Sequence, residues 1–113
     1  MKIGVSSQNF RTITGHAGKG RRFFIYQVDA DGEIHERERL DLPKEMAMHA
    51  FSGGDHPLDR LDVLITGGCG QGFVRKMAAR GVRVVPTGET DPLRAVQLLA
   101  SGAPLAPPKR HEH

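Results

Sequence analysis

The stretch Leu61-Asp62-Val63-Leu64-Ile65-Thr66-Gly67-Gly68-Cys69-Gly70 decides the fold of this 113-residue chain. Residues 61–66 form a nearly continuous apolar run that ends at two glycines, as is typical of a strand buried on both faces of a sheet. Residues 70–80 then carry apolar side chains at helical spacing, and residues 82–85 form another apolar run. The order strand, helix, strand predicts two parallel strands joined by a right-handed crossover.

The flanking sequence completes this unit. Strand-like patterns occur at residues 2–6, 22–28 and 33–40. Turn residues at 29–32 predict that these three strands form an antiparallel meander. Pro57 begins a short helix over residues 57–60, and Thr90 or Asp91 caps a final helix that ends at Gly102. We therefore predict an α/β fold of ribonuclease H-like type, with a mixed five-stranded sheet, three helices and residues 62–66 in a central strand.

Length and composition allow one domain, which we place at residues 1–102, followed by a Pro-rich tail at residues 103–113 that we expect to be disordered. The apolar runs are strand-sized, so we expect no membrane span and a cytoplasmic protein. A net charge of +3 and few aromatic residues argue against nucleic-acid binding. A single cysteine excludes an intramolecular disulfide. We expect a monomer or a weak dimer.

Four loops of the predicted sheet open at the carboxyl ends of its parallel strands, where α/β proteins bind ligands. Candidate ligand residues lie in these loops: His16, His49, His56 and Cys69. Two more histidines, His111 and His113, lie in the tail, and His35 lies on a strand.

Cys69 lies between a buried strand and the start of a helix, where the helix dipole is expected to lower the thiol pKa and favour a thiolate. Thiolates are ligands for soft metals, and His16, in a glycine-rich loop, would add a nitrogen ligand. The alternatives stay open at this point: a surface histidine at His16, and a small residue packed in a tight turn at Cys69. The chain has no CxxC or HxxxH spacing, so the ligands suit a transient guest better than a closed zinc site.

Other functional classes have weaker support. Gly68, Gly70 and Gly72 would allow backbone N–H groups to bind an anion, but their spacing is that of neither a dinucleotide-binding loop nor a P-loop. The first strand lacks the carboxylates of a two-metal nuclease. A nucleophilic pair of Cys69 with His16 or His56 lacks an orienting third group. We therefore expect no enzymatic activity.

Several segments resemble, in order and spacing, the dinitrogenase iron–molybdenum cofactor biosynthesis family of nitrogen fixation, which includes NifX-like carriers and the C-terminal region of NifB-type proteins. The matching segments are His16-Ala17-Gly18-Lys19, Phe23-Phe24-Ile25-Tyr26, Gly53-Gly54-Asp55-His56, residues 61–70 and Gly81-Val82-Arg83-Val84. The sequence differs from the family pattern at Ala17, where Phe is usual, and at Asp55-His56-Pro57, which replaces a His-rich stretch.

This resemblance implies non-catalytic binding of an iron–sulfur or iron–molybdenum cluster, or its precursor, and transfer between metallocofactor-assembly proteins. The cluster-binding candidates are His16, Gly68, Cys69 and Gly70, with His56 or His49 as additional metal ligands. Basic residues flank His16 and could attract an anionic cluster: Arg11, Lys19, Arg21 and Arg22. The alternative function is a regulatory or protein-interaction domain that binds no metal.

Overall fold

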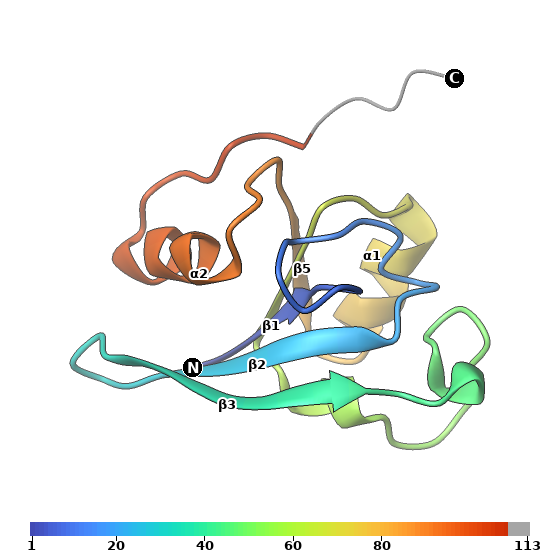
Figure 1. Cartoon of the computed structure of the whole chain (residues 1–113). Helices are drawn as coiled ribbons and strands as arrows, with labels where there is room; N and C mark the ends of the chain where they lie inside the picture. The colour runs from blue at the N-terminus through green and yellow to red at the C-terminus, as the bar shows by residue number, and fades with distance from the viewer. Residues whose placement is uncertain (109–113) are drawn as a thin grey trace.

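The computed structural model describes residues 1–108, which fold around one five-stranded sheet (Figure 1). Its strands are β1 (Lys2–Ser6), β2 (Arg22–Val28), β3 (Ile34–Asp41), β4 (Val63–Thr66) and β5 (Arg83–Pro86), in the spatial order β3-β2-β1-β4-β5. β2 is antiparallel to β1 and β3, whereas β1, β4 and β5 are parallel. The predicted mixed sheet is confirmed, and β4 is an interior strand. The middle position, however, belongs to β1.

Two of the three predicted helices are α-helices in the described residues, α1 (Gln71–Ala79) and α2 (Pro92–Ser101), whereas the third is not an α-helix. Residues 57–60 form a single 3-10 turn, η2 (Pro57–Arg60), because the backbone is already extended again at Leu61. A second 3-10 turn, η1 (Lys44–Met46), lies in the preceding loop. Neither α-helix of this part of the chain is long and apolar enough to cross a bilayer. The ribonuclease H-like classification stays a prediction.

The two α-helices cover opposite faces of the sheet (Figure 1). Ala95 and Val96 of α2 belong to one buried cluster with Ile65, whereas Met77 of α1 belongs to a second buried cluster with Leu64. Because adjacent strand residues point to opposite faces, Leu64 and Ile65 join different clusters. This double burial explains the continuous apolar run in β4.

Strand direction places two sets of loops at opposite edges of the sheet. The loops after β1, β4 and β5 emerge at one edge, because these three strands are parallel. The β2–β3 hairpin lies at the other edge, because β2 runs antiparallel to β1. The predicted ligand loops therefore share the first edge with the start of α1.

The chain continues beyond α2 without regular secondary structure through residue 108. Residues 103–107 nevertheless contact the domain, with Leu105 half-buried against the core cluster that contains Ile65. The predicted tail disorder thus stays a prediction for residues 109–113, and these residues, including His111 and His113, lie outside the described part of the chain.

Candidate functional site

The β1–β2 loop and the β4–α1 loop close on each other at the carboxyl edge of the sheet. The Gly67 N–H donates to the Thr14 carbonyl at 3.0 Å, and the Ala17 N–H donates to the Gly68 carbonyl at 3.5 Å. A Cβ atom at Gly67 would lie 3.1 Å from the Thr14 carbonyl carbon and 3.2 Å from the Gly15 nitrogen. Glycine at position 67 therefore permits the close approach of the two loops that carry His16 and Cys69.

Buried hydroxyl groups at the ends of β1 and β4 stabilise the same contact between the two loops. The Ser6 hydroxyl donates to the Thr14 carbonyl at 2.6 Å and lies 2.9 Å from the Thr66 hydroxyl. Both side chains are buried at the ends of β1 and β4. Since buried polar groups are costly when unpaired, these contacts fix the position of the loops relative to the sheet.

His16 lies at the tip of the first loop. Its backbone has a left-handed φ of 55°, and its carbonyl accepts hydrogen bonds from the N–H groups of Lys19 and Gly20 at 3.0 and 2.9 Å. The His16 side chain is exposed, whereas the neighbouring Ala17 is fully buried. The turn therefore directs the imidazole outward while Ala17 anchors the loop in the core.

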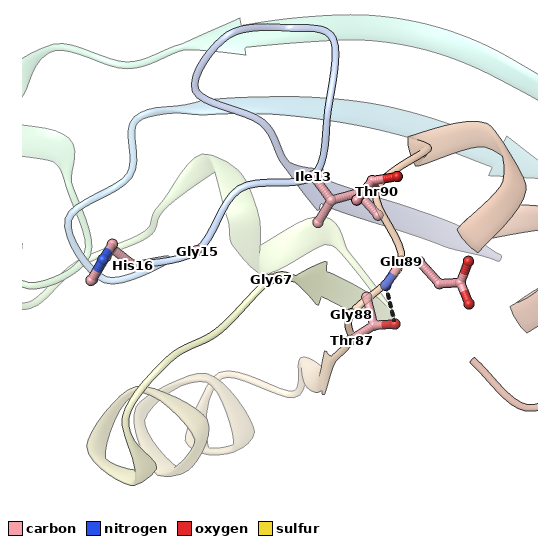
Figure 2. A pocket seen from close by; sticks show the side chains of 8 residues that line it. All are labelled: Ile13, Gly15, His16, Gly67, Thr87, Gly88, Glu89 and Thr90. Atoms are coloured by element: carbon pink, nitrogen blue, oxygen red, sulfur yellow. Dashed lines mark hydrogen bonds between the residues drawn. The ribbon is translucent and has the colours of Figure 1, made fainter. Parts of the chain in front are cut away.

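A cavity of about 230 Å³ lies between this loop and the β5–α2 loop (Figure 2). It is lined by Ile13, Gly15, His16, Gly67, Thr87, Gly88, Glu89 and Thr90. His16 lies at one end and the residues after β5 at the other, where the Glu89 N–H donates to the Thr87 hydroxyl at 3.0 Å. Cys69 does not line this cavity, so a guest that contacts both candidate ligands must extend over the cavity rim.

Cys69 is half-buried just before α1. The predicted lowering of its thiol pKa is wrong: burial raises the pKa of Cys69 above its ordinary value. The α1 N-cap, Gly70, supplies no capping side chain, and Cβ atoms at Gly70 and Gly72 would meet no atom within 4 Å. The surface beside the thiol is therefore open to a bulky guest.

His49 adjoins the His16 loop. Both its backbone N–H and its ring Nδ1 contact the Gly18 carbonyl, at 2.8 and 3.0 Å. Because a carbonyl only accepts hydrogen bonds, Nδ1 carries the proton and the exposed ring presents Nε2 as its ligand atom.

His56 is buried, and both of its ring nitrogens are hydrogen-bonded. The Leu58 N–H donates to Nδ1 at 3.1 Å, and Nε2 contacts the Met46 carbonyl at 2.7 Å. The first bond is part of the capping box of η2, in which the Asp59 side chain accepts from the His56 N–H at 2.9 Å. Metal ligation by His56 would require the loss of one ring hydrogen bond.

The candidate ligands do not form a preassembled metal site. Within residues 1–108, the group of three metal-ligating side chains with ligand atoms within 4.8 Å of one another is Asp29, Glu33 and His35. This group lies on the β2–β3 hairpin, at the opposite edge of the sheet, where His35 Nε2 contacts the Asp29 carboxylate at 3.0 Å. His16 and Cys69 therefore lie on adjoining loops but belong to no complete set of ligands in the described chain.

The basic segment around His16 divides into two parts. Arg11 and Lys19 are exposed. Arg22 instead lies 3.4 Å from the Asp41 carboxylate, and its guanidinium lies 5.6 Å from the centre of the Phe10 ring. Arg22 thus covers the edge of the core and is partly neutralised, so Arg11 and Lys19 carry more of the positive potential of this surface.

Sequence reasoning identified the loop after β5 as part of the ligand edge but proposed none of its residues. The structure places Thr87, Gly88, Glu89 and Thr90 in the cavity wall. The sequence indicated these residues only through their position, directly after a strand that is parallel to β1 and β4.

Comparison with known proteins identifies the family of this chain. Its fold is similar to the crystal structure of PH0822, with a TM-score of 0.71 and 14% identity over 91% of this chain and 93% of the other. It is also similar to the NMR structure of TM1290 from Thermotoga, described as a candidate NifB protein of the DUF35 family, with a TM-score of 0.62 and 16% identity over 99% and 97% of the two chains. At these identities the similarity shows the fold alone.

No curated protein matches the sequence. A family model, described as dinitrogenase iron–molybdenum cofactor, matches residues 1–102. Because this match spans nearly the whole chain, the protein belongs to the dinitrogenase iron–molybdenum cofactor family.

Proposed function

We propose that this protein binds an iron–sulfur or iron–molybdenum cluster, or its precursor, as cargo, and transfers it to metallocofactor-assembly proteins in the cytoplasm. The observation that carries this proposal is the contact between the loops of His16 and Cys69, through the 3.0 Å bond from Gly67 to Thr14. Membership of the iron–molybdenum cofactor family supports the same class of cargo.

In this proposal, Cys69 supplies a sulfur ligand and His16 a nitrogen ligand from the adjoining loop. Gly70 and Gly72, where a Cβ atom would meet nothing within 4 Å, leave room for a large guest beside the thiol, and the positive end of α1 favours an anion there. His49 adds a further nitrogen ligand without losing its bond to Gly18. We assign His56 a structural role at η2 and not a ligand role, because both of its ring nitrogens are hydrogen-bonded.

Few and separated ligands suit a carrier, because a cluster held by a complete cage is slow to leave. The exposed Arg11 and Lys19 provide long-range attraction for an anionic cargo without fixing it in place. Partner proteins then complete the coordination during transfer.

The chemistry of the thiol supports a ligand role for Cys69 over a nucleophilic one. Because burial raises the pKa of Cys69, the thiolate that would act as a nucleophile is scarce at neutral pH. Metal binding is still possible, because a metal displaces the proton from the thiol. We therefore propose a ligand role for Cys69 and no catalytic one.

The second candidate function is a regulatory or protein-interaction domain that binds no metal. Its support is the absence of a preassembled ligand set around His16 and Cys69 in the described chain. Anaerobic incubation with ferrous iron and sulfide separates the two functions. Cluster carriage predicts sulfur-to-iron charge-transfer absorption that stays with the protein during gel filtration, whereas a protein that remains colourless supports the second function.

A further inference from the structure

The segment after α2 folds back onto the loop after β5 (Figure 1). The return begins at Gly102, which has a left-handed φ of 77°, and the Ala103 N–H donates to the Leu98 carbonyl at 2.9 Å. This segment lies beyond the family match, which ends at residue 102.

Ala106 makes three hydrogen bonds to the loop after β5. Its carbonyl accepts from the Gly88 N–H at 3.0 Å and from the Thr87 hydroxyl at 2.7 Å. Its N–H donates to the Glu89 carboxylate at 2.8 Å. Ala106 itself is exposed, so the loop recognises its backbone and not its side chain.

Apolar packing supports these hydrogen bonds. Leu105 is half-buried against the core cluster of α2, alongside Val85 and Leu99. Pro104 and Pro107 flank the contact, and proline restricts the conformations available to the free segment. The segment therefore loses less entropy on docking than a flexible one would.

Gly88 fits this contact closely. A Cβ atom at position 88 would lie 2.5 Å from the Pro107 carbonyl oxygen, which is closer than real Cβ atoms approach other atoms. Gly88 does not have the left-handed backbone that would itself require glycine. The docked segment, and not the local turn, thus excludes a side chain at this position.

We propose that residues 103–107 form a latch that holds the wall of the His16 cavity. Thr87, Gly88 and Glu89 line that cavity and are also the residues bound by Ala106. While the latch is docked, it occupies the Glu89 carboxylate, the Thr87 hydroxyl and the Gly88 N–H. Release of the latch makes these groups available to a guest and frees the wall opposite His16. The latch does not depend on cluster binding.

Amide hydrogen exchange of the full-length protein tests the latch directly. Ala106→Pro removes the N–H that binds Glu89, whereas Ala106→Ser retains it and is the matched control. We expect the Gly88 amide to exchange of order tenfold faster in the proline variant, as for the loss of one stabilising hydrogen bond. The Thr87 amide, which donates to Thr66 within the sheet at 2.9 Å, should keep its protection. Equal Gly88 exchange in parent and proline variant would overturn the proposal.

A double-substitution cycle provides a second test in the full chain. Gly88→Ala should displace the latch and lower the melting temperature by several degrees. In the Ala106→Pro background the latch is already displaced, so the same substitution should have little further effect. If Gly88→Ala lowers the melting temperature equally in both backgrounds, the loop itself requires the glycine and the latch is rejected.

Discussion

His56→Ala separates a structural histidine from a metal ligand. The side chain accepts a hydrogen bond from Leu58, contacts the Met46 carbonyl and packs edge-to-face on Phe51, with ring centroids 4.8 Å apart. Alanine removes all three contacts but leaves the loops of His16 and Cys69 unchanged. If the role of His56 is structural, its loss reduces stability and leaves the cluster content of each folded molecule intact.

The contacts set the size of the expected effect. Loss of an N-cap costs about 1 kcal/mol. Loss of the partner of the part-buried Met46 carbonyl costs about 1 kcal/mol more, and the lost contact with the Phe51 ring adds roughly another 0.5–1 kcal/mol. A total of about 3 kcal/mol lowers the melting temperature of a domain of this size by roughly 10–15 °C. His56→Asn keeps a capping oxygen for the Leu58 N–H, so it should cost about half as much.

Urea unfolding and thermal melting of parent, His56→Ala and His56→Asn measure these differences. Iron and sulfide content, determined after reconstitution and normalised to folded protein, gives the second readout. The structural interpretation fails if His56→Ala melts within about 2 °C of the parent. It also fails if both variants bind much less iron and sulfide per folded molecule than the parent.

Three further predictions concern other positions. Gly67→Ala forces a Cβ against the Thr14 backbone, so it should lower the free energy of unfolding in urea by about 1–3 kcal/mol and reduce cluster loading. The control Gly72→Ala meets open space in the first turn of α1 and should be neutral or stabilising. Equal effects of the two substitutions would refute the loop contact. Cys69 should react with iodoacetamide at a midpoint pH above that of the urea-unfolded chain, because burial raises its thiol pKa; a lower midpoint would contradict this. Burial, as the largest cause, raises the pKa of Tyr26 from 10.0 to about 12. The unfolded chain therefore loses the phenol proton at a lower pH than the folded protein, and the free energy of unfolding should fall as pH rises from 10 to 12. An equal fall in Tyr26→Phe would show another cause.

The sheet could be predicted from the sequence because its strands carry distinct patterns. The unbroken apolar run of β4 reflects burial against both α1 and α2, and the charged side chains of β3 are typical of an edge strand, as observed. The central position of β1 was not readable in this way, because strand order depends on tertiary packing. Residues 57–60 looked helical from Pro57, but their length allows only a 3-10 turn.

The candidate site was less predictable than the sheet. Position along the chain indicated that His16 and Cys69 would share an edge, but it did not show that Cys69 is buried enough for desolvation to raise its thiol pKa. It also did not reveal that both nitrogens of His56 are used in hydrogen bonds, because one partner, Met46, is ten residues away. The bonds of Ala106 to residues 87–89 likewise require the fold to be known.

Cluster content after anaerobic reconstitution of ligand variants tests the central proposal most directly. His16→Ala and Cys69→Ser change side chains on the two adjoining loops, whereas His35→Ala changes a histidine on the hairpin at the opposite edge of the sheet. All three should keep nearly the parental melting temperature, because none of these residues belongs to the core clusters. We predict that His16→Ala and Cys69→Ser each lose most of the bound iron and sulfide, while His35→Ala binds as much as the parent. Parental iron and sulfide content in both loop variants would contradict a cluster site at His16 and Cys69.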